Sequence, residues 1–240
     1  MNIKMNKIIS ALVLLFLLTS CVSDTNKMAL TGNIRGLKKG TLYLQKIKDS
    51  TLVSVDSTKI NGDATFSFSE EIPEPELYYL FLKLDNGILL DDRISFFAEA
   101  KPINISTSLK SFTVDAKITG SENQDKMKLY NKIIQRYSNH NLELIEQSFS
   151  ERQKGNDSLA NKIDLSQKSI IAKKYLATIS FSLSNSDSEI SPYLMVTHVN
   201  NTKLIYLDSV YNKLTPKIKD SKYGKALESL IASRKVISQE

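Results

Sequence analysis

The sequence has 240 residues, enough for one large domain or two small ones, and its formal net charge is +6. The basic excess is modest and spread along the chain, which argues against a nucleic-acid-binding protein. Cys21 is the single cysteine, so an internal disulfide, a Cys-x-x-Cys redox pair and a thiolate metal cluster are excluded.

The first twenty residues have the pattern of a signal peptide. Lys4 and Lys7 precede an apolar run from Ile8 to Leu18, which is shorter than the roughly 20 apolar residues of a membrane-spanning helix. Leu18-Thr19-Ser20-Cys21 follows. Small residues before a cysteine, with leucine at the third place before it, resemble the lipobox of bacterial lipoproteins. In that family the thiol is alkylated with diacylglycerol, the chain is cleaved before the cysteine and the new amine is acylated.

The resemblance implies a signal peptide at residues 1–20, a lipid attachment site at Cys21 with a palmitate-type acyl chain, and a polar tether at residues 21–27. Loss of the two lysines of the signal peptide lowers the net charge from +6 to +4. Val22 rather than aspartate follows the cysteine. By analogy with lipoprotein sorting in other bacteria, this favours the outer membrane, with the periplasmic and the surface-facing leaflet both open.

Residues 28–119 alternate between apolar and polar side chains, as Phe66 and Phe68 do with their neighbours and as residues 112–118 do. Turn signals such as Asn61-Gly62-Asp63 separate the runs. Seven or eight short strands of this kind predict an antiparallel β-sandwich or a partly open barrel. The stretch Leu77–Leu82 is apolar almost throughout, so we expect a central strand covered on both faces.

At Gly120-Ser121 the period changes to that of helices. Ser121 is a predicted N-cap, and apolar residues from Met127 to Leu144 follow at steps of three and four. A second helix over Ser158–Ser184 is expected to fold back along the first. Shorter helices are predicted from Ser191-Pro192, over Leu204–Leu214 and over Tyr223–Ile237. The predicted class is therefore α+β, with a β domain at residues 28–119 and an all-helical domain at residues 120–240.

Tyr78, Tyr79 and Phe81 lie on the predicted central strand. Outward-facing aromatic side chains there form either an interdomain face, covered by the helical half, or an exposed ligand platform. We expect the first arrangement, with the stripe Met127–Leu144 docked on the outer face of the sheet.

Several stretches share one further resemblance. They are MALTGNIRGLKKGTLYLQ from Met28, DSTKINGDATFSFSEEIPEPELYYLFL from Asp56, ITGSENQDKMKLYNK from Ile118 and LDSVYNKLTPKIKDSKYGKALESLIASRKV from Leu207. Together they resemble the domain of unknown function found N-terminal to thioredoxin-like domains in lipoprotein thiol–disulfide oxidoreductases. In that family the helix matching Tyr223–Ile237 leads into the thioredoxin fold. The sequence ends at Glu240 without a Cys-x-x-Cys, so the resemblance implies no oxidoreductase activity for this chain.

Other signals for chemistry are weak. His140 and His198 lie far apart without a carboxylate at ligand spacing, and Asp91-Asp92 fits a charged turn better than a catalytic pair. The sequence contains no Gly-x-Ser-x-Gly elbow and no glycine-rich phosphate loop. We therefore expect no catalytic residues, no metal and no cofactor.

A pattern of Asp, then Ser or Thr, then a small aliphatic residue or threonine occurs four times. It resembles the acceptor motif for periplasmic O-glycosylation, and the alternative is that the Asp-Ser pairs serve as turn residues and N-caps. The candidate acceptors are Ser50, Ser57, Ser158 and Ser209.

We expect a non-enzymatic membrane-anchored lipoprotein that acts as a binding or scaffolding module of the cell envelope. The alternative is an accessory subunit for a separately encoded thioredoxin-like oxidoreductase. The expected partners are the membrane, through Cys21, and an envelope protein such as a thioredoxin-like lipoprotein.

Overall fold

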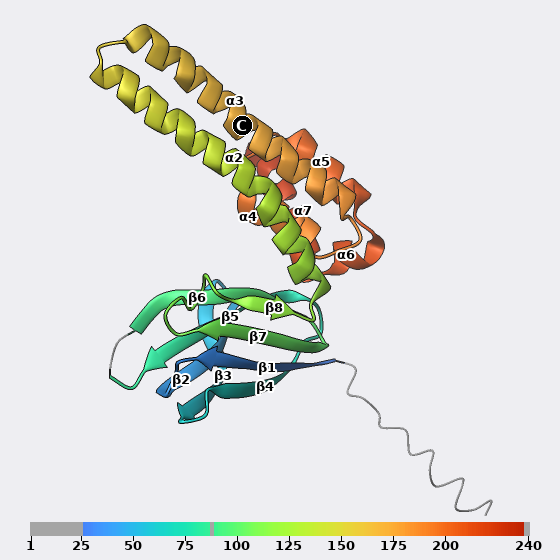
Figure 1. Cartoon of the computed structure of the whole chain (residues 1–240). Coiled ribbons are helices and arrows are strands. Elements are labelled where there is room, and N and C mark those ends of the chain that lie inside the picture. Colours follow the sequence, from blue (N-terminus) through green and yellow to red (C-terminus); the bar gives the residue numbers. More distant parts are fainter. Residues whose placement is uncertain (1–25, 87–88, 238–240) are drawn as a thin grey trace, which may run out of the picture.

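The computed structural model describes residues 26–86 and 89–237 of the chain (Figure 1). The first half of these residues forms two four-stranded sheets, with strand orders β4-β1-β7-β8 and β3-β2-β5-β6. The strands are β1 (Lys27–Arg35), β2 (Lys39–Lys48), β3 (Thr51–Asn61), β4 (Thr65–Glu71), β5 (Glu76–Leu84), β6 (Leu89–Ala98), β7 (Pro102–Ser108) and β8 (Lys117–Thr119). The expected α+β architecture, strands first and helices second, is confirmed.

The period-two pattern of the sequence places one side of each sheet inside. In β1 the exposed and buried residues alternate along the whole strand, with Met28, Leu30 and Ile34 inside. β5 lies between β2 and β6, and its residues Leu80 and Leu82 are fully buried against the opposite sheet. Full burial of an aliphatic side chain of this size is worth about 1.5–3 kcal/mol, so these positions carry much of the stability of the sandwich.

Two details differ from the sequence-based expectation. β1 and β7 pair in parallel, with Leu30 opposite Ile103, because β7 returns beside β1 after the chain has built the other sheet. The stretch Phe112–Asp115 forms turns rather than a strand. Thr107 Oγ1 donates to the Phe112 carbonyl at 2.6 Å, and this local hydrogen bond competes with a continuous ladder.

The helical half contains two long helices followed by four shorter ones within the described residues. They are α2 (Glu122–Gln153), α3 (Asp157–Ser184), α4 (Ile190–His198), α5 (Leu204–Lys213), α6 (Pro216–Asp220) and α7 (Lys222–Ile237). The predicted N-cap is confirmed, because Ser121 Oγ accepts a hydrogen bond from the Gln124 backbone N–H at 3.1 Å. The helix predicted from Ser191-Pro192 begins one residue earlier, so Ser191 lies inside α4, where it donates a hydrogen bond to the Ser182 carbonyl.

α2 and α3 form an antiparallel hairpin that extends far from the sandwich, while α4 to α7 pack around its base (Figure 1). With 32 residues, α2 is about 48 Å long. Ser148 Oγ donates to Asp164 Oδ1 at 2.5 Å and Lys174 Nζ donates to Ser138 Oγ at 3.1 Å, which fixes the register of the two helices. We call this α2–α3 hairpin the arm.

The arm does not dock on the sheet as expected. Apart from its first turns, α2 runs away from the sandwich, and its buried residues Tyr130 and Ile134 pack against α3 and α4 instead. The apolar residues between Met127 and Leu144 could pack either on the sheet or on another helix. They pack on helices because a short turn places α3 directly alongside α2.

Gly120 joins the two halves in a conformation that excludes side chains. Its φ is +99°, and a Cβ atom there would lie 2.1 Å from the Pro102 carbonyl oxygen. The link between the last strand and the arm is therefore both short and sterically restricted.

The β2–β3 hairpin offers a test of backbone strain. Asp49 and Ser50 have φ values of +47° and +64°, the arrangement of a type I′ turn, which favours Asn-Gly. Replacing Asp49-Ser50 by Asn-Gly should stabilise the protein by about 1 kcal/mol in urea denaturation, because glycine relieves the left-handed strain. As a control, Ser57→Gly on exposed β3 should lower the stability. An unchanged or lower midpoint for the Asn-Gly variant would contradict the strain argument.

Candidate functional site

The outer face of the β3-β2-β5-β6 sheet meets the helices at an aromatic cluster centred on Phe97. Phe97 alternates with Phe96, so it points away from the sandwich core and is nevertheless fully buried. Its ring packs edge-on against Tyr193 of α4 at 5.2 Å and Tyr223 of α7 at 6.3 Å, measured between ring centroids. Edge-to-face pairs of this kind add to the free energy of burial, so Phe97 anchors the helices on the sheet.

Tyr223 also satisfies the sheet backbone. Its hydroxyl accepts a hydrogen bond from the Leu77 backbone N–H at 2.9 Å, at the start of β5. Burial raises the pKa of the Tyr223 hydroxyl well above its usual range, so the group stays neutral. Beside it lies a cavity of about 170 Å³ lined by Tyr79, Tyr193 and Tyr223 among others.

The three aromatic residues predicted to form one face of β5 separate into three environments. Tyr79 lies at the cavity between the sheet and the helices. Phe81 is half-buried on the same side, with its ring 6.0 Å from that of Tyr43 and the Arg93 guanidinium 4.7 Å from its centre. Tyr78 points into the sandwich core and is fully buried. Its inclusion in the face was wrong, because neighbouring strand residues point to opposite sides.

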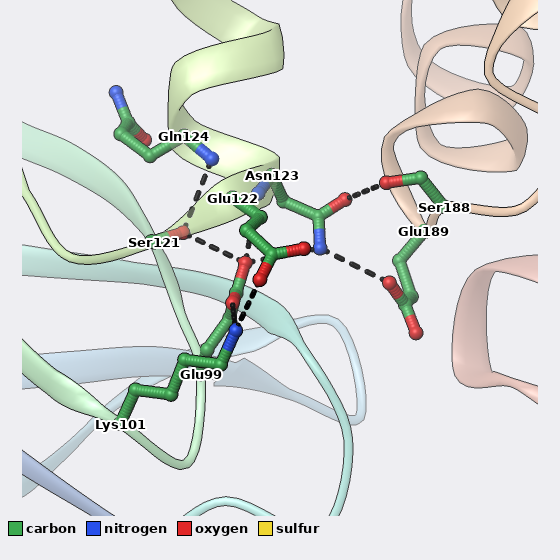
Figure 2. Close-up of polar contacts among 8 residues, drawn as sticks. All are labelled: Glu99, Lys101, Ser121, Glu122, Asn123, Gln124, Ser188 and Glu189. Atoms are coloured by element: carbon green, nitrogen blue, oxygen red, sulfur yellow. Dashed lines mark hydrogen bonds and ion pairs between the residues drawn. The ribbon is translucent and has the colours of Figure 1, made fainter.

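A polar cluster lies next to the aromatic one, where α2 begins (Figure 2). Glu99 follows β6 and is only 5% exposed. Its Oε1 accepts hydrogen bonds from Ser121 Oγ at 2.9 Å, from the Asn123 backbone N–H at 2.8 Å and from Asn123 Nδ2 at 3.1 Å. A carboxylate at the N-terminus of a helix is stabilised by the backbone N–H groups there and by the helix dipole.

Asn123 extends this cluster to the C-terminal helices. Its Nδ2 also donates to Glu189 Oε2 at 3.0 Å, and its Oδ1 accepts from Ser188 Oγ at 2.7 Å and from the Ile190 backbone N–H at 2.9 Å. Every hydrogen-bonding position of the buried amide is therefore used, and the bonds join β6, α2 and α4. We call Glu99, Asn123 and Glu189 the junction cluster.

The junction cluster borders a cavity of about 330 Å³ between the end of the sandwich and the base of the arm. Glu99 and Glu189 both line it, and both are 5% exposed. Lys101 lies 3.8 Å from Glu99 and is also bound by Glu122, whose pKa is lowered by the hydrogen bond from Lys101. The site thus combines deeply buried carboxylates with a partly open rim.

The two histidines form no joint site. His140 Nδ1 lies 3.1 Å from Glu143 Oε2 on the exposed surface of α2. His198 ends α4, where its ring packs edge-on against Tyr130 at 5.4 Å. Partial desolvation, together with the nearby Lys174, lowers the pKa of His198, although the residue reaches the surface.

The predicted acidic turn is part of a strand. Asp91 and Asp92 belong to β6, and the Asp92 side chain is exposed, whereas the Asp91 side chain lies outside the described residues. Within the described ranges, no group of three or more His, Cys, Asp or Glu residues is placed to hold a metal ion.

All four candidate glycosylation serines are exposed: Ser50 in the β2–β3 turn, Ser57 on β3, Ser158 in the first turn of α3 and Ser209 on α5. Ser209 Oγ donates to the Ile205 carbonyl at 2.6 Å within its own helix. Cys21 lies outside the described residues. Among the helices that the structure describes, none has the length and apolar character needed to cross a membrane.

The arm carries large apolar side chains in contact with solvent. Leu142, Ile145 and Phe149 of α2 are 55%, 43% and 63% exposed. They recur at steps of three and four, so they share one face of the helix, and we call them the arm stripe. Apolar periodicity alone does not separate these exposed residues from their buried neighbour Leu144.

The junction cluster generates a stability prediction. Asn123→Ala removes the amide between two buried carboxylates and should lower the free energy of unfolding by about 2–4 kcal/mol, since buried charges lose their hydrogen bonds. Chemical denaturation measures the effect. Asn131→Ala, at an exposed position of the same helix, should change stability by less than about 0.5 kcal/mol. Equal effects of the two substitutions would show that the junction cluster contributes nothing specific.

Comparison with known proteins bears on the β half. Residues 28–127, which cover the sandwich and the first turns of α2, match the model of a family described as a domain of unknown function, DUF4369. No curated protein matches the chain significantly. The sandwich and the start of the arm are therefore similar to a domain family for which no function is described.

Proposed function

We propose that this chain is a non-enzymatic, membrane-anchored lipoprotein of the cell envelope, and that its arm binds a helix of a partner protein. The observation that carries the proposal is the arm stripe. Large apolar side chains gathered on one protruding face are typical of interaction sites.

The kind of partner follows from how the chain covers the same face at its base. Met127 and Ile134 of α2 pack against Ile190 and Leu194 of α4. Leu142, Ile145 and Phe149 follow Ile134 by eight, eleven and fifteen positions, so they continue that face beyond the reach of α4. A surface that already accepts one helix is suited to a second one laid along it.

The anchor supports this arrangement. Asn26, the first described residue, lines the same cavity as Asn123 at the base of the arm. Five residues of tether span at most about 17 Å from Cys21 to that point, whereas α2, which forms one side of the arm, is about 48 Å long. A lipid at Cys21 would therefore hold the base near the outer membrane and leave the arm tip accessible to a partner.

The anchor is tested by Cys21→Ser. The wild-type protein should incorporate a fatty-acid analogue and resist extraction from membranes by salt, because three acyl chains exceed the two signals that stable anchoring needs. The variant should remain uncleaved and unlabelled. Labelling that survives in the variant would rule out Cys21 as the acylated residue.

The arm stripe is tested by cross-linking in intact cells, followed by binding measurements with each captured protein after purification. Phe149→Ser should weaken the interaction by at least about tenfold, as expected for a central apolar contact. Leu129→Ser is the matched control, because Leu129 is 59% exposed on the same helix but lies off the stripe.

The identity of the partner decides between the two functions under consideration. A thioredoxin-like lipoprotein bound through the stripe would favour the accessory-subunit alternative, and a second copy of this chain would make the stripe a dimer interface. A partner that binds Phe149→Ser and wild type equally would contradict the proposed role of the stripe.

A further inference from the structure

An aromatic cavity lies between the sheet and the helices, beside the buried cluster around Phe97. Its floor is the outer face of the β3-β2-β5-β6 sheet, where Leu77 and Tyr79 of β5 and Ile47 of β2 line it. The cavity volume is about 170 Å³, similar to that of an engineered apolar cavity of about 150 Å³ that binds benzene. The space therefore accommodates a single six-membered ring.

The roof of the cavity comes from α4 and α7. Tyr193 and Thr197 are four residues apart and share one face of α4, and Tyr223 lies in the first turn of α7. The rings of Tyr193 and Tyr223 pack edge to face, with their centroids 5.1 Å apart. Together with Tyr79 on the floor, three aromatic rings line the space. Aromatic walls favour an aromatic ligand, because ring–ring contacts add to the free energy of burying apolar surface.

The cavity opens to solvent on one side. Ile47, Thr197 and Lys222 line it and are exposed, so a small molecule can enter there while the two halves stay in place. Lys222 Nζ is bound by Glu76 and donates to the Ile47 carbonyl at 3.3 Å. Lys222 belongs to the lining of the cavity and Glu76 does not. The ammonium group at the rim disfavours a cationic ligand, which aromatic rings would otherwise suit.

One polar group of the lining has no bond to the protein. Within the described residues, the Tyr79 hydroxyl has no hydrogen-bond partner, whereas the Tyr223 hydroxyl accepts from the Leu77 backbone N–H. Partial burial raises the pKa of Tyr79, so its hydroxyl group is neutral and can both donate and accept. A ring that carries a hydroxyl group can pair with it, which a pure hydrocarbon cannot.

We propose that this cavity binds a small phenol, with the ring of the ligand among Tyr79, Tyr193 and Tyr223 and its hydroxyl group paired with that of Tyr79. The cavity shares no residue with the arm stripe. The proposal therefore does not rest on the proposed function, and the two can fail independently.

The test is fluorine NMR titration of the purified full-length lipoprotein in detergent, with detergent alone as the blank. The probes are para-fluorophenol and fluorobenzene, which share the ring and differ in the hydroxyl group. We expect saturable binding of para-fluorophenol at millimolar concentration or below, and binding of fluorobenzene that is about three- to tenfold weaker. Phenol should displace the probe. Cyclohexanol, which has the hydroxyl group without the aromatic ring, should not displace it at the same concentration.

Three variants separate the contributions of the hydroxyl group and of the space. Tyr79→Phe keeps the ring, so it should weaken para-fluorophenol by the same factor and leave fluorobenzene unchanged. Tyr43→Phe is the matched control, because it removes a tyrosine hydroxyl from β2, where the ring packs near Phe81 outside the cavity. It should bind both probes like the wild type. Ile47→Phe fills part of the cavity and should abolish binding of both.

Thermal melting shows which variants are folded, and if Ile47→Phe is not, the two tyrosine variants carry the test. Four results would each overturn the proposal: no saturable binding above the blank, displacement by cyclohexanol as effective as by phenol, unchanged affinity for para-fluorophenol in Tyr79→Phe, or full binding by folded Ile47→Phe.

Discussion

The amide of Asn123 is the contact on which the arrangement of the molecule depends. It donates to carboxylates from the sandwich and from α4, and it accepts from a hydroxyl and a backbone N–H at the start of α4. A buried amide of this kind tolerates little displacement, because each lost hydrogen bond leaves a desolvated polar atom. The direction of the arm relative to the sheets is fixed there, within its first helical turn.

The sandwich and the helical half are joined by two neighbouring clusters, the aromatic cluster around Phe97 and the junction cluster. The rings around Phe97 remove apolar surface from water and supply most of the favourable free energy, but apolar contacts are only weakly directional. The hydrogen bonds around Asn123 contribute less net free energy, but they impose strict distances and angles. The apolar cluster therefore holds the two halves together, and the polar cluster sets their relative orientation. Both are needed if the tip of a protruding arm is to have a defined position.

Much of the fold follows from local sequence patterns. Alternation along β1 and β4 and the cap at Ser121 depend on neighbours in sequence, and the structure shows them where they were predicted. The parallel pairing of β1 with β7 and the position of the arm depend on contacts between distant segments, for which the pattern carries no signal. The stripe Met127–Leu144 suited either the sheet or another helix, and apolar periodicity cannot choose between them.

The candidate site was harder to foresee than the fold. Asn123 follows a helix cap in a polar stretch, where an exposed residue would be expected. Glu99 and Glu189 are separated from it by long intervals of chain. The one usable signal was Phe96-Phe97, because two adjacent apolar residues on a strand indicate burial on both faces. Tyr193 and Tyr223 had no distinguishing pattern, since aromatic residues on short helices are common in ordinary cores.

The tight joint at Gly120 gives the arm the mechanics of a lever. The Pro102 carbonyl oxygen lies so close to Gly120 that a Cβ atom would not fit there, so the pivot is restricted on one side and the junction cluster restrains it on the other. A tilt of about ten degrees at such a pivot would move the tip of an arm about 48 Å long by about 8 Å. Small changes in side-chain packing at the base would therefore be amplified into displacements of molecular size at the far end, well away from the sandwich.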